Sequence, residues 1–409
     1  ILESDIIWYH NHLRSYRNRY LLETGAANPS ARTLNTPEEE IGEMMRRVIA
    51  HEIGHALGLP HNMKASSAYP VDSLRSGAFT QKMGIATTIM DYARYNYVAQ
   101  PGDTGIRFVR QMGPYDNYAI EWGYRYFKEN DSDYEKEVLK EIVDKKSLDP
   151  LYMFGSRGND PNTQTENIGD DPVKASSYGL KNLKIVAENL ETWTTPTGAS
   201  YDDLRELYGE LIGVYRRYIY HVVTIVGGVY ETLMVQGQDA LPYQNVSAEK
   251  QREALAFLNT HLWRTQGWLF SPSMISKFER NGILQRITDL QKAALYRILS
   301  PRTLNNMLSQ ENTLAGNPLK VKALLQILQT DLVANNPLKT VSDRELQKNY
   351  VHRILELAED EKLTPEIRGL MALDVVELEK HFKAQRSKGS IENKAHALYC
   401  YKLLKARND

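Results

Sequence analysis

One eleven-residue stretch, residues 51–61, constrains this chain more than any other part of its sequence. It reads His-Glu-Ile-Gly-His-Ala-Leu-Gly-Leu-Pro-His, an H-E-x-x-H-x-x-G-x-x-H pattern. Residues four apart lie on one face of a helix, so His51 and His55 can present two imidazoles to one point. A helix that carries surface histidines and binds no metal is the alternative, but the third histidine and the glycine at fixed offsets make a chance match rare.

The end of this stretch predicts a tight turn that returns a third ligand. Gly58 suits the left-handed conformation that ends a helix, and Pro60 prevents the helix from resuming, so the chain can bring back His61. Three histidines leave the fourth position of a tetrahedral zinc ion open for water, as in catalytic zinc sites. Glu52 cannot point the same way as both helical ligands and is placed to take a proton from that water. The sequence therefore predicts one Zn²⁺ held by the three histidines, with Glu52 as the general base.

The histidine pattern resembles that of the metzincin zinc endopeptidases, and a second stretch extends the resemblance. Thr-Ile-Met-Asp-Tyr at residues 88–92 is similar to the Met-turn, a tight methionine-containing turn beneath the metzincin zinc. By this resemblance Met90 forms the base of the site, and Tyr92 is a candidate ligand or transition-state hydrogen-bond donor. Asp91 and Asn62 are further candidates for holding the ligand residues in place, although Asn62 also suits an ordinary turn.

A third resemblance lies at residues 113–124, which look like the helix that closes a metzincin catalytic domain. More narrowly, the chain resembles large bacterial zinc-dependent metalloproteases that carry long helical C-terminal regions. This resemblance implies export to the periplasm, the cell surface or the medium. Metzincins place a twisted sheet before the active-site helix, whereas the 35 residues before Thr36 favour helix and loop. We therefore expect only the lower half of the cleft in this chain. The chain begins with Ile1 and is expected to be a fragment or processed product. The missing sheet bears on whether the chain cleaves peptides by itself.

The active-site helix has a clear predicted start. Thr36 suits the N-cap position, Pro37 the first helical position, and Glu39 completes a capping box. The acidic run at residues 38–40 also favours the positive end of the helix dipole. These features predict a rigid helix that begins about four turns before His51.

The expected fold is mainly α, with a metzincin-like catalytic part followed by helices. We expect a zinc catalytic domain over residues 1–128, comprising the active-site helix and the Met-turn, an irregular linker or covering segment over 129–180, and an α-helical domain over 181–409. Within the last, residues 201–234 favour one or two helices with a kink at Gly227-Gly228. Segments with helical periodicity and short loops continue to the end of the chain.

Turn residues and acidic residues are dense between residues 149 and 178. They include Gly158-Asn159-Asp160-Pro161-Asn162 and Gly169-Asp170-Asp171-Pro172. Hard cations prefer several oxygen ligands, so Ca²⁺ is possible here, but the spacing matches no known calcium loop and ordinary turn chemistry is the favoured interpretation.

Composition excludes several classes of protein. A net charge of −1 gives no argument for binding nucleic acid or anionic lipid. A single cysteine, Cys400, excludes an intrachain disulfide framework. No apolar run approaches the roughly 20 residues that a membrane-spanning helix requires. The sequence carries no indication of oligomeric state.

These features favour a zinc-dependent endopeptidase that acts on proteins or peptides. A binding or scaffold protein with a vestigial or structural metal site is the main alternative. Glu52 speaks against it, because a structural zinc does not need that carboxylate and usually fills its fourth position with protein. A zinc hydrolase of a non-peptide amide is a second alternative.

Overall fold

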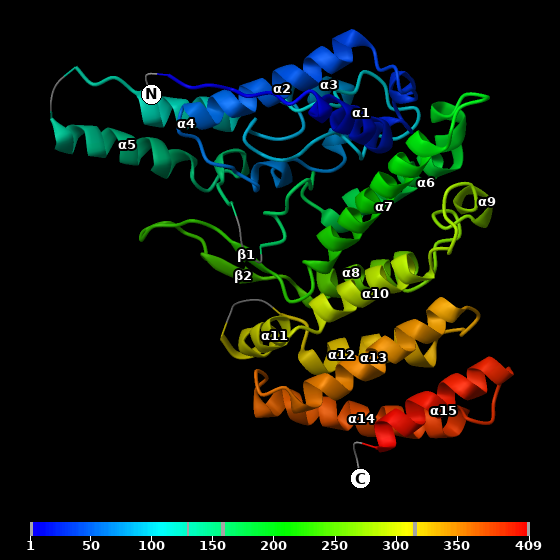
Figure 1. The fold of residues 1–409 in the computed structure, drawn as a ribbon. Helices are drawn as coiled ribbons and strands as arrows, with labels where there is room; N and C mark the ends of the chain where they lie inside the picture. The colour runs from blue at the N-terminus through cyan, green and yellow to red at the C-terminus, as the bar shows by residue number, and fades with distance from the viewer. Residues whose placement is uncertain (1–2, 129–130, 157–159, 314–316, 407–409) are drawn as a thin grey trace. The chain divides into compact units, whose positions relative to one another are not determined.

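The structure is a computed structural model that describes residues 3–128, 131–156, 160–313 and 317–406 (Figure 1). The chain divides into two compact units, one of residues 1–221 and 229–243, the other of residues 222–228 and 244–409. The fold is mainly α, as the sequence predicts.

The first unit combines helices with long loops. Its helices are α1 (Asn11–Thr24), α2 (Glu38–Ala56), α3 (Gly77–Met83), α4 (Pro114–Tyr124), α5 (Ser132–Lys146), α6 (Pro172–Thr194) and most of α7 (Asp202–Val223). Short 3₁₀ helices lie at Pro29–Ala31, Ala65–Ser67, Ser73–Arg75 and Pro150–Tyr152. A two-stranded sheet of β1 (Val229–Glu231) and β2 (Tyr243–Asn245) lies where the chain passes from one unit to the other.

The second unit consists mainly of helices. Its helices are α8 (Ala248–His261), α9 (Pro272–Ile275), α10 (Leu284–Ile298), α11 (Pro301–Thr313), α12 (Val321–Gln329), α13 (Val341–Glu359), α14 (Pro365–Gln385) and α15 (Ile391–Lys405), with a π-helical turn at Thr330–Ala334. Helix α13 packs against α10, α14 and α15, so it forms the centre of this unit.

Helix α2 ends as predicted but begins differently. Gly58 has a φ of 88°, the Leu59 N–H donates to the Gly54 carbonyl, and the Gly58 N–H donates to the His55 carbonyl, which together form a Schellman motif. At the other end the predicted capping box is wrong. Pro37 is the N-cap residue with a ψ of 142°, so the helix starts at Glu38, and the buried Thr36 hydroxyl finds no hydrogen-bond partner among the residues that the structure describes.

Helices α1 and α2 pack around a small aromatic core. Tyr20, Met44, Tyr95 and Val109 are buried together, and Tyr95 and Val109 form an isolated antiparallel bridge between two loops. Met44 precedes His51 by seven residues, so it lies on the same face of α2, and its burial anchors the start of the face that carries the helical ligands.

The compact units divide the chain later than the expected boundary near residue 180. That position lies inside α6, which packs against α1 and belongs to the first unit. The helix expected over residues 201–234 ends at Val223, because Gly227 adopts a φ of 69° that no α-helix contains, and a β-strand follows. Between residues 3 and 37 the structure has α1 and one 3₁₀ turn and no strand.

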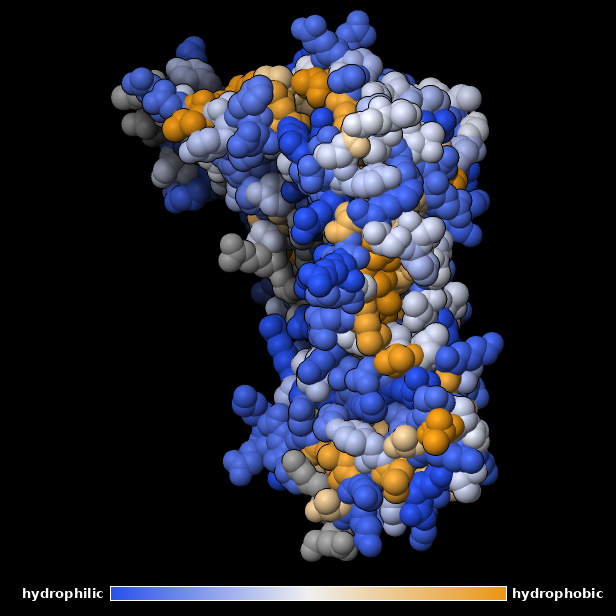
Figure 2. All heavy atoms as spheres, turned by 45° about the vertical axis from the view of Figure 1, so that its right-hand side comes forward, coloured by the Kyte–Doolittle hydropathy of each residue, from blue (hydrophilic) through white to orange (hydrophobic). Residues whose placement is uncertain are grey.

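Among the residues that the structure describes, no helix is both long and apolar enough to cross a bilayer. Hydrophobic side chains that reach the surface form separate orange patches among hydrophilic residues on the face shown in Figure 2. Surface hydrophobic residues of this kind are ordinary in folded proteins.

Candidate metal centre

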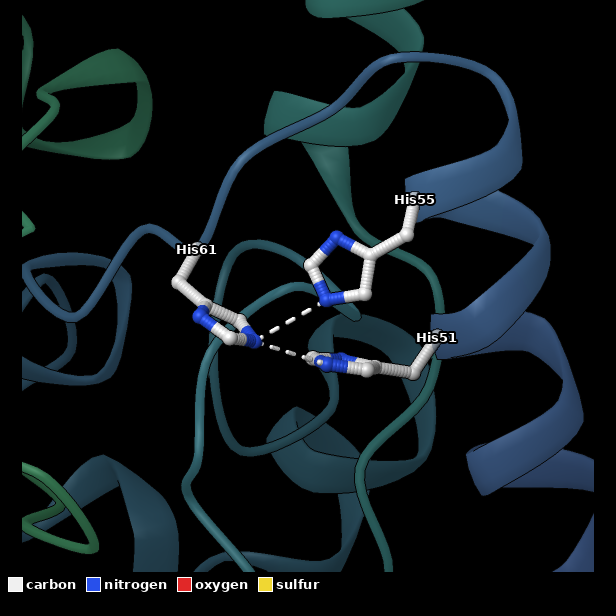
Figure 3. A group of neighbouring side chains, drawn as sticks. All are labelled: His51, His55 and His61. Atoms are coloured by element: carbon white, nitrogen blue, oxygen red, sulfur yellow. Dashed lines mark hydrogen bonds between the residues drawn. The ribbon is translucent and has the colours of Figure 1, made fainter.

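The three histidines of the sequence pattern converge in the structure (Figure 3). His51 and His55 project from α2, and His61 returns from the loop that follows the glycine turn. The Nε2 atom of His61 lies 3.2 Å from Nε2 of His51 and 3.0 Å from Nε2 of His55. Among the described residues this is the group of three or more histidine, cysteine or carboxylate side chains close enough to share one ion.

These distances fit a zinc ion. Zn–N bonds of about 2.0–2.1 Å at tetrahedral angles put two nitrogen ligands about 3.3–3.4 Å apart. A carboxylate or thiolate that would fill a fourth position is absent from the cluster within the described part of the chain. The donor set is therefore that of an open zinc site, with three neutral nitrogen ligands.

Backbone carbonyls set the tautomer of the two helical histidines. Nδ1 of His51 lies 2.8 Å from the Ile89 carbonyl, and Nδ1 of His55 lies 2.9 Å from the Leu59 carbonyl. A carbonyl only accepts, so each Nδ1 carries the proton and donates it. The lone pair of each ring is then on Nε2, the atom that faces the other ligands. Hydrogen bonds of this kind commonly orient metal-binding histidines.

Burial keeps His51 neutral. The pKa of His51 is lowered to about 3, mainly by burial and to a smaller extent by the positive charge of Arg110 and by the other two imidazoles, while the bond to Ile89 opposes the shift. At neutral pH the ring is unprotonated at Nε2, which is the form that binds a metal.

The loop that holds His51 is itself fixed by α4. The carboxylate of Asp116 accepts hydrogen bonds from the Thr88 hydroxyl, from the Ile89 N–H at 2.9 Å and from the Gly113 N–H at 2.8 Å. A Cβ at Gly113 would overlap the Thr87 carbonyl, so this close approach requires glycine. Asp116, which sequence reasoning did not select, therefore positions the carbonyl that orients the first ligand.

Met90 lies directly against the active-site helix. Its side chain is 1% exposed, and its sulfur occupies the space that a Cβ at Gly54 would need. Its carbonyl also accepts from the N–H of Asn62, the residue after the third histidine. Met90 thus contacts both the helix that carries the first two histidines and the loop that carries the third.

Asn62 and Asp91 are completely buried and hold loops rather than lining the cavity. The Asn62 side chain donates to the Met153 carbonyl at 2.9 Å and accepts from the Gly155 N–H at 3.1 Å. The Asp91 carboxylate accepts from the N–H groups of Ser66 and Ala93 at 2.9 and 2.7 Å. Burial raises the pKa of Asp91 to about 6.

Glu52 and Tyr92 both reach the cavity of about 360 Å³ that contains the three imidazoles. The Tyr92 ring lies 4.4 Å from the ring of His61 and 5.6 Å from that of His51, measured between centroids, and the residue is 39% exposed. Burial raises the pKa of Tyr92, and the negative charge of Glu52 raises it further, so the two groups are electrostatically close and the phenol is protonated at neutral pH.

The same cavity contains three arginines and a tyrosine that the sequence interpretation missed. Arg47, Arg94, Arg110 and Tyr16 line it beside the predicted residues. A signal existed for Arg47, which precedes His51 by four residues and so shares its helix face. Arg94, Arg110 and Tyr16 carry no such spacing, because they reach the cavity only through tertiary packing.

Protein donors engage the carboxylates that were considered for calcium. Asp160 pairs with the buried Lys64 at 2.8 Å and accepts from the Asn162 N–H, while Asp171 caps α6 through the N–H groups of its first turn. Gly158 and Asn159 lie outside the described residues. Among the described residues, Glu166 pairs with Arg94 and Arg217, and Asp170 accepts from the Val71 N–H.

A mainly α chain whose H-E-x-x-H helix and following loop bring three imidazoles to one point belongs to the class of zinc metalloprotease-type proteins. A sequence model of the Met-zincin family matches residues 33–338, most of the chain, and the chain therefore belongs to the Met-zincin family. The resemblance to metzincins that the sequence suggested is thus confirmed. A search of curated proteins and one of solved structures found no match. Family membership implies zinc as the metal and peptides as the class of substrate.

Proposed function

We propose that the chain is a zinc-dependent endopeptidase in which Glu52 is the general base. One observation carries the proposal: three Nε2 atoms point at one another while the neighbouring carboxylate of Glu52 lines the same cavity and takes no part in the cluster. A structural zinc site would use a fourth protein ligand and would have no need of a free carboxylate. Residues His51, His55 and His61 would hold the metal.

The chemistry that a bound zinc ion supplies is Lewis acidity, which acidifies water at the site and polarises a peptide carbonyl. Glu52 accepts a proton from the attacking water and returns it to the nitrogen of the leaving amine. The carbonyls of Ile89 and Leu59 hold the helical imidazoles in the tautomer that leaves Nε2 free. No residue of the chain forms a covalent bond to the substrate.

Tyr92 is proposed to donate a hydrogen bond to the oxygen on which negative charge develops. Its raised pKa keeps the hydroxyl protonated, and its ring packs beside His61. A donor aimed at a developing oxyanion contributes about 3–4 kcal/mol in other acyl-transfer enzymes.

The metal is tested by analysis of the purified 409-residue chain. We expect about one equivalent of zinc, lost on treatment with a chelator and regained on adding zinc back. A chain that takes up no zinc after such an addition would end the proposal.

The role of Glu52 is tested with Glu52→Gln, which keeps the size of the side chain and removes its basicity. We expect zinc content to stay near one equivalent and cleavage of labelled casein to fall about 10²- to 10⁴-fold. Glu38→Gln, at an exposed position in the first turn of the same helix, is the matched control and should cleave at the wild-type rate. A wild-type chain that holds zinc but cleaves no peptide would favour the scaffold alternative.

A further inference from the structure

The cavity beside the three histidines is lined by more cationic than anionic side chains. Arg47, Arg94 and Arg110 reach it, against the single carboxylate of Glu52. Arg94 has an anionic partner, the buried carboxylate of Glu166 at 2.8 Å, which it shares with Arg217 at 2.6 Å. Arg47 and Arg110 form no ion pair with any residue that the structure describes.

Both of these arginines are nearly buried, at 5% exposure, and only partly satisfied. Nη1 of Arg47 donates to the Arg94 carbonyl at 2.9 Å, and Nη1 of Arg110 donates to the Ala93 carbonyl at 3.0 Å. The Nε atom of each is buried with no hydrogen-bond partner within the described ranges. The Arg47 guanidinium also lies 5.3 Å from the ring centroid of Tyr16, which forms part of the cavity wall.

Nearby carboxylates do not account for the charge of Arg110. Asp91 and Asp116 influence it electrostatically, but both accept hydrogen bonds from backbone N–H groups and neither pairs with it. A buried cation without a paired anion costs several kcal/mol of stability. A chain that retains two such cations at the edge of its candidate active site has a site ready for an anion.

The position of these arginines relates the anion to the scissile bond. Arg47 precedes His51 by four residues, which is about 6 Å along α2. Adjacent Cα atoms of an extended peptide are about 3.8 Å apart. A carboxylate on the residue next to the scissile bond can therefore lie about as far from that bond as Arg47 lies from His51 along the helix. A guanidinium presents paired N–H groups that match a carboxylate.

We propose that Arg47 and Arg110 form an anion-binding subsite that selects peptides carrying a carboxylate on the residue next to the scissile bond. This specificity rests on the endopeptidase function proposed above. The carboxylate has two possible sources, the side chain of aspartate or glutamate, and the free C-terminus of a peptide cut one residue from its end. The chemistry of recognition is the same for both.

The wild-type chain provides the first test. Fluorogenic peptides with amidated C-termini are compared in matched pairs that carry aspartate or asparagine, and glutamate or glutamine, next to the scissile bond. A further pair differs only in having a free or an amidated C-terminus. We expect kcat/KM to be at least about tenfold higher for the acid of a pair, as for a charge-assisted hydrogen bond. The pair that shows the preference identifies the source of the carboxylate. Equal kcat/KM within every pair would overturn the proposal.

The second test replaces each arginine. In Arg110→Met and in Arg47→Met the ratio of kcat/KM for acid and amide peptides should fall towards one, while Arg47→Lys, which keeps the charge and loses the fork, should keep an intermediate ratio. Arg46→Met is the control, because Arg46 directly precedes Arg47 on α2 and its side chain is 74% exposed. Zinc content and circular dichroism identify any variant that fails to fold, and the wild-type ratio does not depend on the variants. An unchanged ratio in both folded variants would refute the assignment to these residues.

A binding measurement separates this proposal from the endopeptidase function. The same labelled peptides are titrated with zinc-loaded Glu52→Gln chain and followed by fluorescence anisotropy. Acid peptides that bind at least about tenfold more tightly than their amides support the subsite even if the wild-type chain cleaves none of them. Cleavage without any preference in rate or binding would leave the endopeptidase function standing and overturn the subsite.

Discussion

The contact between Gly54 and Met90 provides the sharpest test of the structure of the metal centre. Gly54 is buried in the last turn of α2, two residues from Glu52 and next to His55. A Cβ at this position would overlap the Met90 sulfur and lie 3.2 Å from Met90 Cε. Gly54→Ala therefore adds one methyl group where the structure has no room for it.

Two opposing terms set the expected effect on stability. Alanine is favoured over glycine inside a helix by about 0.5–1 kcal/mol, whereas overpacking of a filled core costs about 1–3 kcal/mol. The net destabilisation is then between about 0 and 2.5 kcal/mol, and a Tm change of about 2–4 °C per kcal/mol applies to a unit of this size. Gly42→Ala is the matched control on the same helix, because nothing lies within 4 Å of its added Cβ, and it should raise the Tm.

The effect on zinc should exceed the effect on stability. Displacement of Met90 shifts the adjacent Ile89 carbonyl, which holds Nδ1 of His51, and loss of such an orienting bond costs about 10- to 100-fold in metal affinity. Chelator competition measures the affinity and thermal melting the stability of Gly54→Ala, Met90→Ala and the double variant. We expect the double variant to lose less stability than the two single variants lose together, because alanine at position 90 vacates the space that the added Cβ at position 54 needs. Purely additive effects, or a Gly54→Ala chain with wild-type zinc affinity, would refute this reasoning.

Two further predictions concern buried charges elsewhere in the chain. Lys64→Met removes the partner of Asp160, whose side chain is 1% exposed, and should destabilise the chain by about 3–5 kcal/mol. Lys174→Met removes one member of an exposed pair and should leave the stability nearly unchanged, and denaturant unfolding measures both variants. Burial raises the pKa of Asp374 to about 6, although the hydroxyl of Tyr350 donates to it at 2.7 Å. Between about pH 4 and pH 6 the folded state therefore keeps a proton on this carboxyl that the unfolded state releases. The carboxyl stabilises the fold at low pH, and this contribution of at most about 3 kcal/mol is lost as the pH rises through about 6. In Asp374→Asn this part of the slope of stability against pH should disappear, and an unchanged slope would contradict the assignment.

Local patterns in the sequence predicted the end of α2 and the residues of the histidine cluster. Gly58 adopts the left-handed conformation because the chain must reverse there, and the turn returns His61 to the two helical histidines. Both features depend on residues within the one stretch 51–61, so their physics is contained in the local sequence. The mainly α fold was predictable for the same reason.

Features that depend on distant packing could not be predicted in the same way. Thr36 and Glu39 satisfied the capping-box pattern, but Pro37 takes an extended ψ that starts the helix one residue later, and the Thr36 hydroxyl has no partner within the described part of the chain. Arg110 reaches the cavity from a loop far along the chain. The requirement for glycine at position 54 is set by Met90, a residue that no local pattern connects to it.

Residues 89–94, which begin inside the predicted Met-turn, connect the metal centre to the proposed anion subsite. The Ile89 carbonyl faces one way and orients His51, while the carbonyls of residues 93 and 94 accept hydrogen bonds from Arg110 and Arg47. Asp116 anchors the start of this segment, so one short stretch of backbone fixes the ligand and both cations. The histidine pattern specifies which residues can hold a metal, whereas this segment sets how far from the metal a bound carboxylate would lie. Specificity in this chain is therefore expected to depend on the geometry of residues 89–94 as much as on the arginines themselves.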